Sequence, residues 1–218
     1  MTLTQLQKDL IFGSLLGDGN LQTSSNGRTW RYTAIQKSED KQYLFNKYEI
    51  LKNLCGVAVV PKENEILDKR TNKLIKRWSF NTLTNTSLKF FGNMFYRYDS
   101  NKQKWIKKVP LKIQTFLNPR ALAYFYMDDG ALKWLGHSNA MRICTKNFSL
   151  EDIHRIKKAL KNLYNIDTNL TKKKLKNEEI RFRILIPEKN SNSFRELIKP
   201  YLIECMKYKV SDGNYGHL

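Results

Sequence analysis

The sequence predicts an α+β protein built from two similar halves, each with the order helix, two strands, helix, two strands, helix. An apolar segment of helical length that ends in an acid and a glycine occurs twice, at residues 10–19 and 122–130. The stretches after each copy alternate between period-two patterns of apolar and basic residues, typical of half-buried strands, and patterns of helical period. We therefore expect one antiparallel sheet in each half, with one packed face and one polar face.

An internal repeat extends beyond the two motif segments. The sequence Leu-Lys-Asn-Leu begins at Leu51 and recurs from Leu160. A lysine precedes a valine at Lys108 and again at Lys209. Matched features in the same order in both halves indicate a duplication, and we expect two subdomains related by a pseudo-two-fold axis.

The duplication sets the predicted boundaries within the 218 residues. The N-terminal subdomain is expected at residues 1–98, a linker that contains Pro110 at residues 99–116, and the C-terminal subdomain at residues 117–218. Because one chain already supplies both halves of a dimer, we expect a monomer without an obligate protein partner.

The second motif helix carries the clearest chemical signal. Asn118 and Pro119 suit an N-cap and a first helical position, and the apolar run that follows ends in Asp128, Asp129 and Gly130. Two carboxylates at a helix C-terminus, where the macrodipole is already negative, cost free energy unless a cation lies beside them. A single motif of this kind is better explained by a solvated turn after a core helix.

The first motif repeats this ending, since Gly17, Asp18 and Gly19 follow its apolar run and Asp18 aligns with Asp129. Two aligned copies favour a metal site over a solvated turn. If the helices pack side by side through Gly13 and Gly17, their C-terminal ends meet and bring the two acids together. A shell of carboxylate, carbonyl and phosphate oxygens suits Mg²⁺ rather than zinc or copper.

The predicted strands have one apolar and one basic face. In the strand expected at residues 30–37, Trp30, Tyr32 and Ala34 share one face, and the opposite face is polar except for Ile35. The same alternation recurs at residues 77–81, 141–146 and 181–186. Polar faces of this kind could read base edges in the major groove while outlying basic residues hold phosphates. The side chains expected to contact nucleic acid are Arg28, Arg31, Thr33, Lys37, Arg77, Ser79, Asn81, Arg142, Lys146, Lys172, Lys174, Arg181 and Arg183.

Helical periodicity predicts further helices behind the sheets. They are expected at residues 40–54, 86–96, 149–164 and 193–207. Ser38 and Ser149 are suitable N-caps for two of them. Loop-rich hairpins are expected at residues 59–67 and 170–179, where they would follow the backbone of DNA.

Net charge points to a polyanionic partner. The chain holds 39 Lys and Arg against 20 Asp and Glu, a formal charge of +19, and the excess is spread over both halves. Attachment to an anionic membrane surface is the weaker alternative, because many basic residues lie on predicted strands rather than on one helix face.

Composition also bears on the compartment. The sequence has neither an apolar run of membrane-spanning length nor a signal peptide, so we expect an intracellular protein with no membrane partner. Cys55, Cys144 and Cys205 lack metal-ligand spacing and are expected to be free, buried thiols. Abundant Lys and Asn would suit an AT-rich genome, such as that of a mitochondrion or chloroplast.

The chain resembles the LAGLIDADG homing endonucleases in their single-chain, two-motif form. The resemblance rests on residues 11–19 and 122–130, on the lysines before Pro110 and Val210, and on residues 197–202. It covers nearly the whole chain. Two departures are that Leu16 and Met127 replace the first acid of the nine-letter pattern. A third is Tyr124, which stands at the early glycine of the pattern and would fill the space opposite a glycine of the other helix.

The resemblance implies a site-specific endonuclease that cuts both strands of double-stranded DNA across the minor groove and leaves short 3′ overhangs. The two sheets would form a DNA-binding saddle around motif helices packed against each other. Mg²⁺ would be the cofactor, with Mn²⁺ as a substitute. Its ligands would be Asp18 and Asp129, with Gly17 and Asp128 as further candidates at the helix ends.

The resemblance also implies lysines near the centre of the site. They would be Lys107 or Lys108 in the first half and Lys209 in the second. We prefer Lys107, because its distance from Pro110 resembles the arrangement in the family, whereas the internal repeat favours Lys108.

Two other functions share this fold. One is an RNA maturase that assists intron splicing, with intron RNA as partner. The other is a sequence-specific DNA-binding regulator without catalysis. Retention of both Asp18 and Asp129 argues for cleavage, because a protein that only binds nucleic acid has no need of two costly acids at the helix ends.

Overall fold

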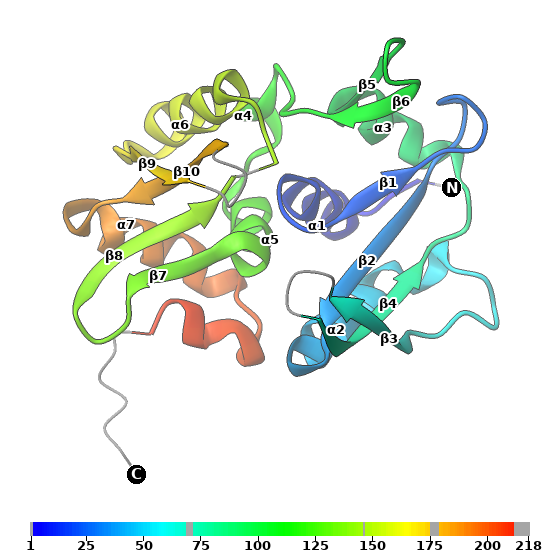
Figure 1. The fold of residues 1–218 in the computed structure, drawn as a ribbon, viewed down its shortest axis with the longest axis horizontal. Helices are drawn as coiled ribbons and strands as arrows, with labels where there is room; N and C mark the ends of the chain where they lie inside the picture. Colours follow the sequence, from blue (N-terminus) through cyan, green and yellow to red (C-terminus); the bar gives the residue numbers. More distant parts are fainter. Residues whose placement is uncertain (1, 69–71, 146, 175–178, 212–218) are drawn as a thin grey trace.

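The computed structural model describes residues 2–68, 72–145, 147–174 and 179–211. Two four-stranded sheets lie on either side of two central helices, α1 (Gln5–Leu16) and α5 (Pro119–Asp129), which pack side by side (Figure 1). The predicted pair of αββαββα halves is therefore confirmed.

The first half continues after α1 with a sheet of strand order β1-β2-β4-β3, all neighbours antiparallel. Its remaining elements are β1 (Asn20–Gln22), β2 (Arg31–Lys37), α2 (Lys41–Leu51), β3 (Lys62–Asp68), β4 (Lys73–Asn81) and α3 (Lys89–Phe95). Helix α2 packs on β2 and β4, so it covers one face of the sheet.

The second half repeats this topology with strand order β7-β8-β10-β9. After α5 its elements are β7 (Gly130–Trp134), β8 (Ser138–Cys144), α6 (Leu150–Tyr164), β9 (Asn169–Lys174), β10 (Ile180–Ile186) and α7 (Glu188–Ile198). Helices α6 and α7 cover the same face of this sheet that α2 covers in the first.

The segment between the halves has more structure than the linker predicted at residues 99–116. It contains a hairpin of β5 (Tyr96–Asp99) and β6 (Lys104–Lys107) and the short helix α4 (Ile113–Phe116). The last helix also differs from its expected range of 193–207, because Pro200 lacks the N–H that would continue α7, and two 3₁₀ segments follow instead.

The predicted strand faces are confirmed in β2. Trp30, Tyr32 and Ala34 are buried in the core, and Ile35 is 41% exposed on the opposite face. The three cysteines are free, as expected, but they are half-buried rather than buried. None of the helices in the described part of the chain has the length and hydrophobicity needed to cross a bilayer.

The contact between the two motif helices depends on glycine. A Cβ atom added at Gly13 would lie 2.1 Å from the carbonyl oxygen of Ala121 and 2.7 Å from Cβ of Tyr124. At Gly17 it would lie 2.5 Å from Cβ of Asp128. Tyr124 thus faces a glycine of the other helix, as expected. The predicted N-cap Asn118 is confirmed, since its side chain accepts the N–H of Ala121. Helix α1 begins with a capping box between Thr4 and Gln7.

We expect Gly13→Ala to lower the free energy of unfolding by about 1–3 kcal/mol, because its methyl group would overlap the backbone of α5. Denaturant unfolding measures this loss. The control is Gly56→Ala, whose methyl would meet only the side chains of Val59 and Leu83, at 3.3 and 3.6 Å, and is expected to change stability by less than about 0.5 kcal/mol. Equal stability of the two variants would contradict the proposed packing constraint.

Candidate active site and nucleic-acid interface

The C-terminal ends of the two motif helices meet between the two sheets. Helix α1 ends at Leu16, so Asp18 lies just beyond it, whereas Asp129 is the last residue of α5. The backbone N–H of Asp18 donates to Oδ2 of Asp128 across the contact, at 3.3 Å. The structure therefore brings the acids of both motifs to one junction.

A lysine side chain binds the carbonyl groups at the end of each motif helix. Lys107 Nζ, at the end of β6, donates to the carbonyl oxygens of Gly17 and Gly19 at 3.0 and 2.7 Å. Lys209 Nζ donates to the carbonyl oxygens of Met127 and Asp128. A cation at this position opposes the negative end of the helix dipole. Each half thus places one lysine Nζ against two carbonyl oxygens at the end of its motif helix.

Lys108 occupies a different position from Lys107. Its backbone N–H donates to the carbonyl oxygen of Phe95 at 2.7 Å. Among the described hydrogen bonds its side chain has none to the helix ends, so the geometry favours Lys107 as the lysine of the first half.

Electrostatics at the junction are strongly perturbed. Burial, together with the charges of Asp18 and Asp128, raises the pKa of Asp129 to about 8. Asp18 lies at the exposed rim of the junction, yet the surrounding protein and the charge of Asp128 raise its pKa as well. Burial lowers the pKa of Lys107 to about 8 and also lowers the pKa of Lys209. The lysines therefore do not fully balance the negative charge of the ionised acids at the junction. A site with such an excess of negative charge favours the binding of a cation.

The space beside Asp129 suits an ion. A hollow of about 10 Å³ lies between Gly17, Lys107, Asp129 and Thr145. This volume admits about one water molecule or ion. Among the described residues, no three His, Cys, Asp or Glu side chains converge on a point, so the protein offers no complete cage. Mg²⁺ fits such a site, because it binds one or two carboxylates and takes its other oxygens from water and phosphate.

Neither Asp18 nor Asp128 lines this hollow, and the carboxylate of Asp128 is held by other side chains. Its Oδ1 accepts from Lys47 Nζ at 2.6 Å and from Gln36 Nε2 at 3.3 Å, and the side chains of Lys47 and Asp128 are at most 1% exposed. The geometry thus favours Asp18 and Asp129 over Asp128 as metal ligands.

The uncovered face of the first sheet carries the polar residues that the sequence predicts. Thr33 pairs with Asn81, Ile35 with Ser79, and Lys37 with Arg77, so these side chains share one face with Arg31. Arg28 lies in the turn before β2, where its Nε donates to the carbonyl oxygen of Ser25 at 3.2 Å. Thr33 Oγ1 is buried on this face without a hydrogen-bond partner, which leaves a polar atom for a ligand to satisfy.

The uncovered face of the second sheet differs in one respect from the expectation. Arg142, Arg181 and Arg183 share this face, but the register pairs Arg181 with Lys173. Lys172 and Lys174 pair with Phe182 and Ile180, on the face of the buried residues. Lys173 therefore takes the position predicted for its neighbours, and Lys146 lies outside the described residues.

Comparison with known proteins identifies the family. The model of the LAGLIDADG DNA endonuclease family matches residues 8–194. The chain belongs to this family.

Two relatives illustrate the range of functions. The DNA endonuclease I-ChuI of Chlamydomonas applanata is 68% identical over 218 residues, and the match covers all of both chains. The cytochrome b mRNA maturase bI2 of Saccharomyces cerevisiae is 30% identical over 208 residues, which is 94% of this chain and 47% of that protein.

Solved structures share the fold. The homing endonuclease I-WcaI bound to its DNA recognition sequence superposes with a TM-score of 0.81 at 21% identity, over 97% of this chain and 88% of that chain. I-DmoI in complex with DNA and Mn gives a TM-score of 0.54 at 17% identity, over 91% of this chain and 99% of that chain. The two-sheet architecture is thus that of LAGLIDADG homing endonucleases.

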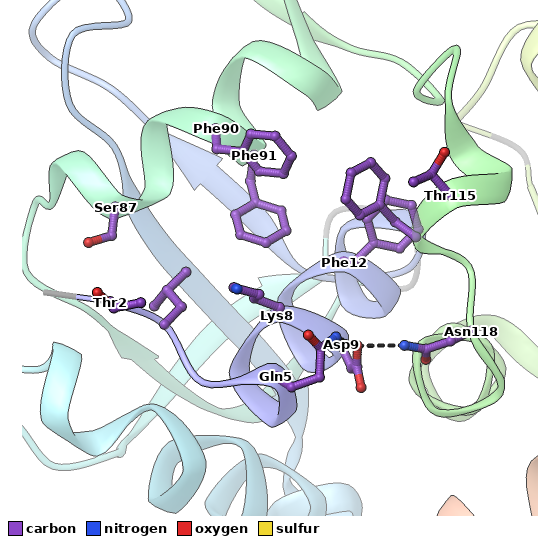
Figure 2. Close-up of a pocket in the computed structure, with 12 residues that line it drawn as sticks. Thr2, Gln5, Lys8, Asp9, Phe12, Ser87, Phe90, Phe91, Thr115 and Asn118 are labelled. Atoms are coloured by element: carbon purple, nitrogen blue, oxygen red, sulfur yellow. Dashed lines mark hydrogen bonds between the residues drawn. The ribbon is translucent and has the colours of Figure 1, made fainter.

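A separate cavity of about 630 Å³ opens at the other end of α1, away from Asp18. Figure 2 shows Phe12, Phe90 and Phe91 on its walls and Lys8 projecting into it, with Asp9 bound to Asn118. Asp18 and Asp129 do not line this cavity, so it is separate from the junction of the two acids.

Sequence reasoning missed the partners of Asp128. Lys47 lies four residues after Tyr43 and four before Leu51, within the apolar stripe of α2, and is fully buried. A lysine in such a stripe requires an anionic partner, and this signal was present in the sequence. Gln36 follows Ile35 near the end of β2 and carried no comparable signal.

In metal-free protein, we expect Asp129→Asn to be more stable than wild type at about pH 8.5, with a smaller gain at about pH 5. Because the folded protein raises the pKa of Asp129 to about 8, the wild type loses stability as the pH rises toward that value, whereas Asn does not ionise. Melting in EDTA measures the difference, and each kcal/mol corresponds to about 2–4 °C for a chain of this size.

The matched control is Asp167→Asn, which removes an exposed acid that pairs with Lys161 at 2.9 Å. Its pKa is lowered by Lys161, so this substitution is not expected to stabilise the protein at either pH. An Asp129→Asn variant that melts at or below the wild-type temperature at high pH would contradict the assigned charge imbalance.

Proposed function

We propose that this chain is a site-specific homing endonuclease that cuts both strands of a long double-stranded DNA target by divalent-metal-dependent hydrolysis. The observation that carries the proposal is the meeting of Asp18 and Asp129 at a junction flanked by two basic sheet faces. Its family and its 68% identity to a DNA endonuclease over the full length support the same function.

Asp18 and Asp129 are the proposed metal ligands, with the carbonyl oxygen of Gly17 beside them. Mg²⁺, or Mn²⁺ in its place, would activate water and stabilise the oxygens of the scissile phosphate. Lys107 and Lys209 lie at the ends of the motif helices, where each neutralises charge that develops on a phosphate. A pKa of about 8 leaves Lys107 mostly protonated at neutral pH and able to donate a proton there.

The two uncovered sheet faces are the proposed DNA-binding surface. Arginine, asparagine and serine side chains on ribbons that follow the major groove read base edges, and the outlying lysines bind phosphates. The pseudo-two-fold relation between the sheets suits a target with two half-sites on either side of the cleavage positions.

A second candidate function is RNA maturation. Relatives named cytochrome b mRNA maturase bI2, from Saccharomyces cerevisiae and Debaryomyces hansenii, are 30% and 28% identical to this chain. These names also favour an organellar location. Binding of intron RNA by the basic sheet faces would not require the acids, so the two functions are separable by substitution.

Cleavage of a plasmid library with random inserts tests the main proposal. We expect site-specific double-strand cutting in Mg²⁺, none in EDTA, and binding without cutting in Ca²⁺. Asp18→Asn and Asp129→Asn should each abolish double-strand cutting and retain binding in Ca²⁺. If the wild type binds nucleic acid but does not cut DNA whichever divalent metal is added, the endonuclease proposal is refuted and the maturase or regulator is favoured.

Substitutions on opposite faces of the second sheet test the DNA-binding surface. We expect Arg183→Ala to weaken binding to the selected target by about 1–3 kcal/mol and to reduce its salt dependence. Lys172→Ala is the control, because the register turns Lys172 to the other face, and should weaken binding by less than about threefold. Titration of labelled DNA in Ca²⁺ gives both values. Equal losses in both variants would argue against this assignment of faces.

A further inference from the structure

A buried ion pair joins the two halves beside the catalytic junction. Lys47 of α2 and Asp128 of α5 lie 2.6 Å apart, and both side chains are almost completely shielded from solvent. Lys47 Nζ also lies 4.2 Å from the centroid of the Tyr43 ring. Asp128 binds Lys47 and Gln36 through Oδ1, and through Oδ2 it accepts the backbone N–H of Asp18.

The pseudo-symmetry of the fold shows that this arrangement occurs once. The alignment of Asp18 with Asp129 matches Gly17 to Asp128. The repeat that aligns Leu51 with Leu160 matches Lys47 to Ile156, which is fully buried.

The position equivalent to Gln36 also differs. Thr145 takes this place in the second half, and its hydroxyl donates to the carbonyl oxygen of Phe182 at 2.9 Å. The equivalent of the charged cluster is therefore an isoleucine, a glycine and a threonine, so the fold itself does not require an ion pair at this position.

The two acids also differ in how their backbones are held. Asp129 is part of α5 and is fixed by helical hydrogen bonds. Asp18 lies two residues beyond the end of α1, after Gly17 with φ −104° and ψ −131°. Its N–H is therefore outside the helix and binds the side chain of Asp128 instead. The position of Asp18 thus depends on where Lys47 and Gln36 hold that carboxylate.

We propose that Asp128, anchored by Lys47 and Gln36, is a positioning residue for Asp18 and not for Asp129, so that this anchor supports one of the two cleavage centres and not the other. This inference rests on the proposed endonuclease function. A misplacement of a reactive group by about 1 Å can slow a reaction by about a hundredfold. Loss of the anchor should therefore slow the cleavage of one strand far more than that of the other.

Strand-resolved cleavage tests the proposal. The selected target is labelled with a different fluorophore at the 5′ end of each strand, and single-turnover rates are measured in Mg²⁺ for both strands. The ratio of the two wild-type rates is the reference. The ratio of the two rates should change by about ten- to hundredfold in Lys47→Ile/Asp128→Ala, which replaces the ion pair by apolar side chains and leaves no unpaired buried charge.

Ile156→Val is the matched control at the equivalent position of the second half. It removes one buried methyl group and is expected to leave the ratio of strand rates unchanged. A variant that only weakens the fold would slow both strands together, so the ratio separates positioning from stability.

Three results decide the matter. A double variant with an unchanged ratio overturns the inference and leaves the endonuclease function intact. A wild type that cuts neither strand overturns the proposed function instead. If the double variant does not fold, Gln36→Leu, which removes the second anchor of Asp128, must shift the ratio in the same direction or the inference fails.

Discussion

The close contact between α1 and α5 is the constraint on which the rest of the structure depends. Gly13 and Gly17 allow the two helix backbones to approach so closely that the C-terminal ends of the helices meet. Side chains from both halves therefore contact one another at this junction, and the two sheets lie on either side of it. A bulkier helix contact would separate the acids and change the angle between the two sheets, so packing and chemistry are set by the same residues.

Like charges gather at this junction, and the chain compensates for them only in part. Lys107 and Lys209 bind the carbonyl groups at the helix ends, and Lys47 neutralises Asp128 from within the core. Asp129 has no described hydrogen bond or ion pair, and its pKa is raised to about 8. The protein alone therefore holds a site that is destabilising at neutral pH. That cost is characteristic of groups arranged for a ligand rather than for stability.

The sequence allowed the elements and their faces to be predicted, because periodicity is local information. Trp30, Tyr32 and Ala34 followed from alternation alone. The pairing register of the strands could not be predicted in this way, because it depends on turn geometry. A shift of one residue exchanges the two faces of a strand. That is why Lys172 was chosen where Lys173 lies. The partner of Asp128 belongs to the other half of the chain, and no local pattern connects residues so far apart.

A single chain with two motifs can vary each half separately, which a symmetric dimer cannot. The structure shows this freedom at the junction, where α5 extends through Asp129 but α1 stops before Asp18. An acid held by its own helix needs no outside support, whereas an acid beyond the helix end needs a neighbouring group to fix it. The carboxylate of Asp128 accepts the N–H of Asp18 and so supplies this support. Because that carboxylate is buried, it requires the positive charge of Lys47 as a partner. One difference in helix length thus accounts for a chain of three polar residues that has no equivalent across the pseudo-two-fold axis.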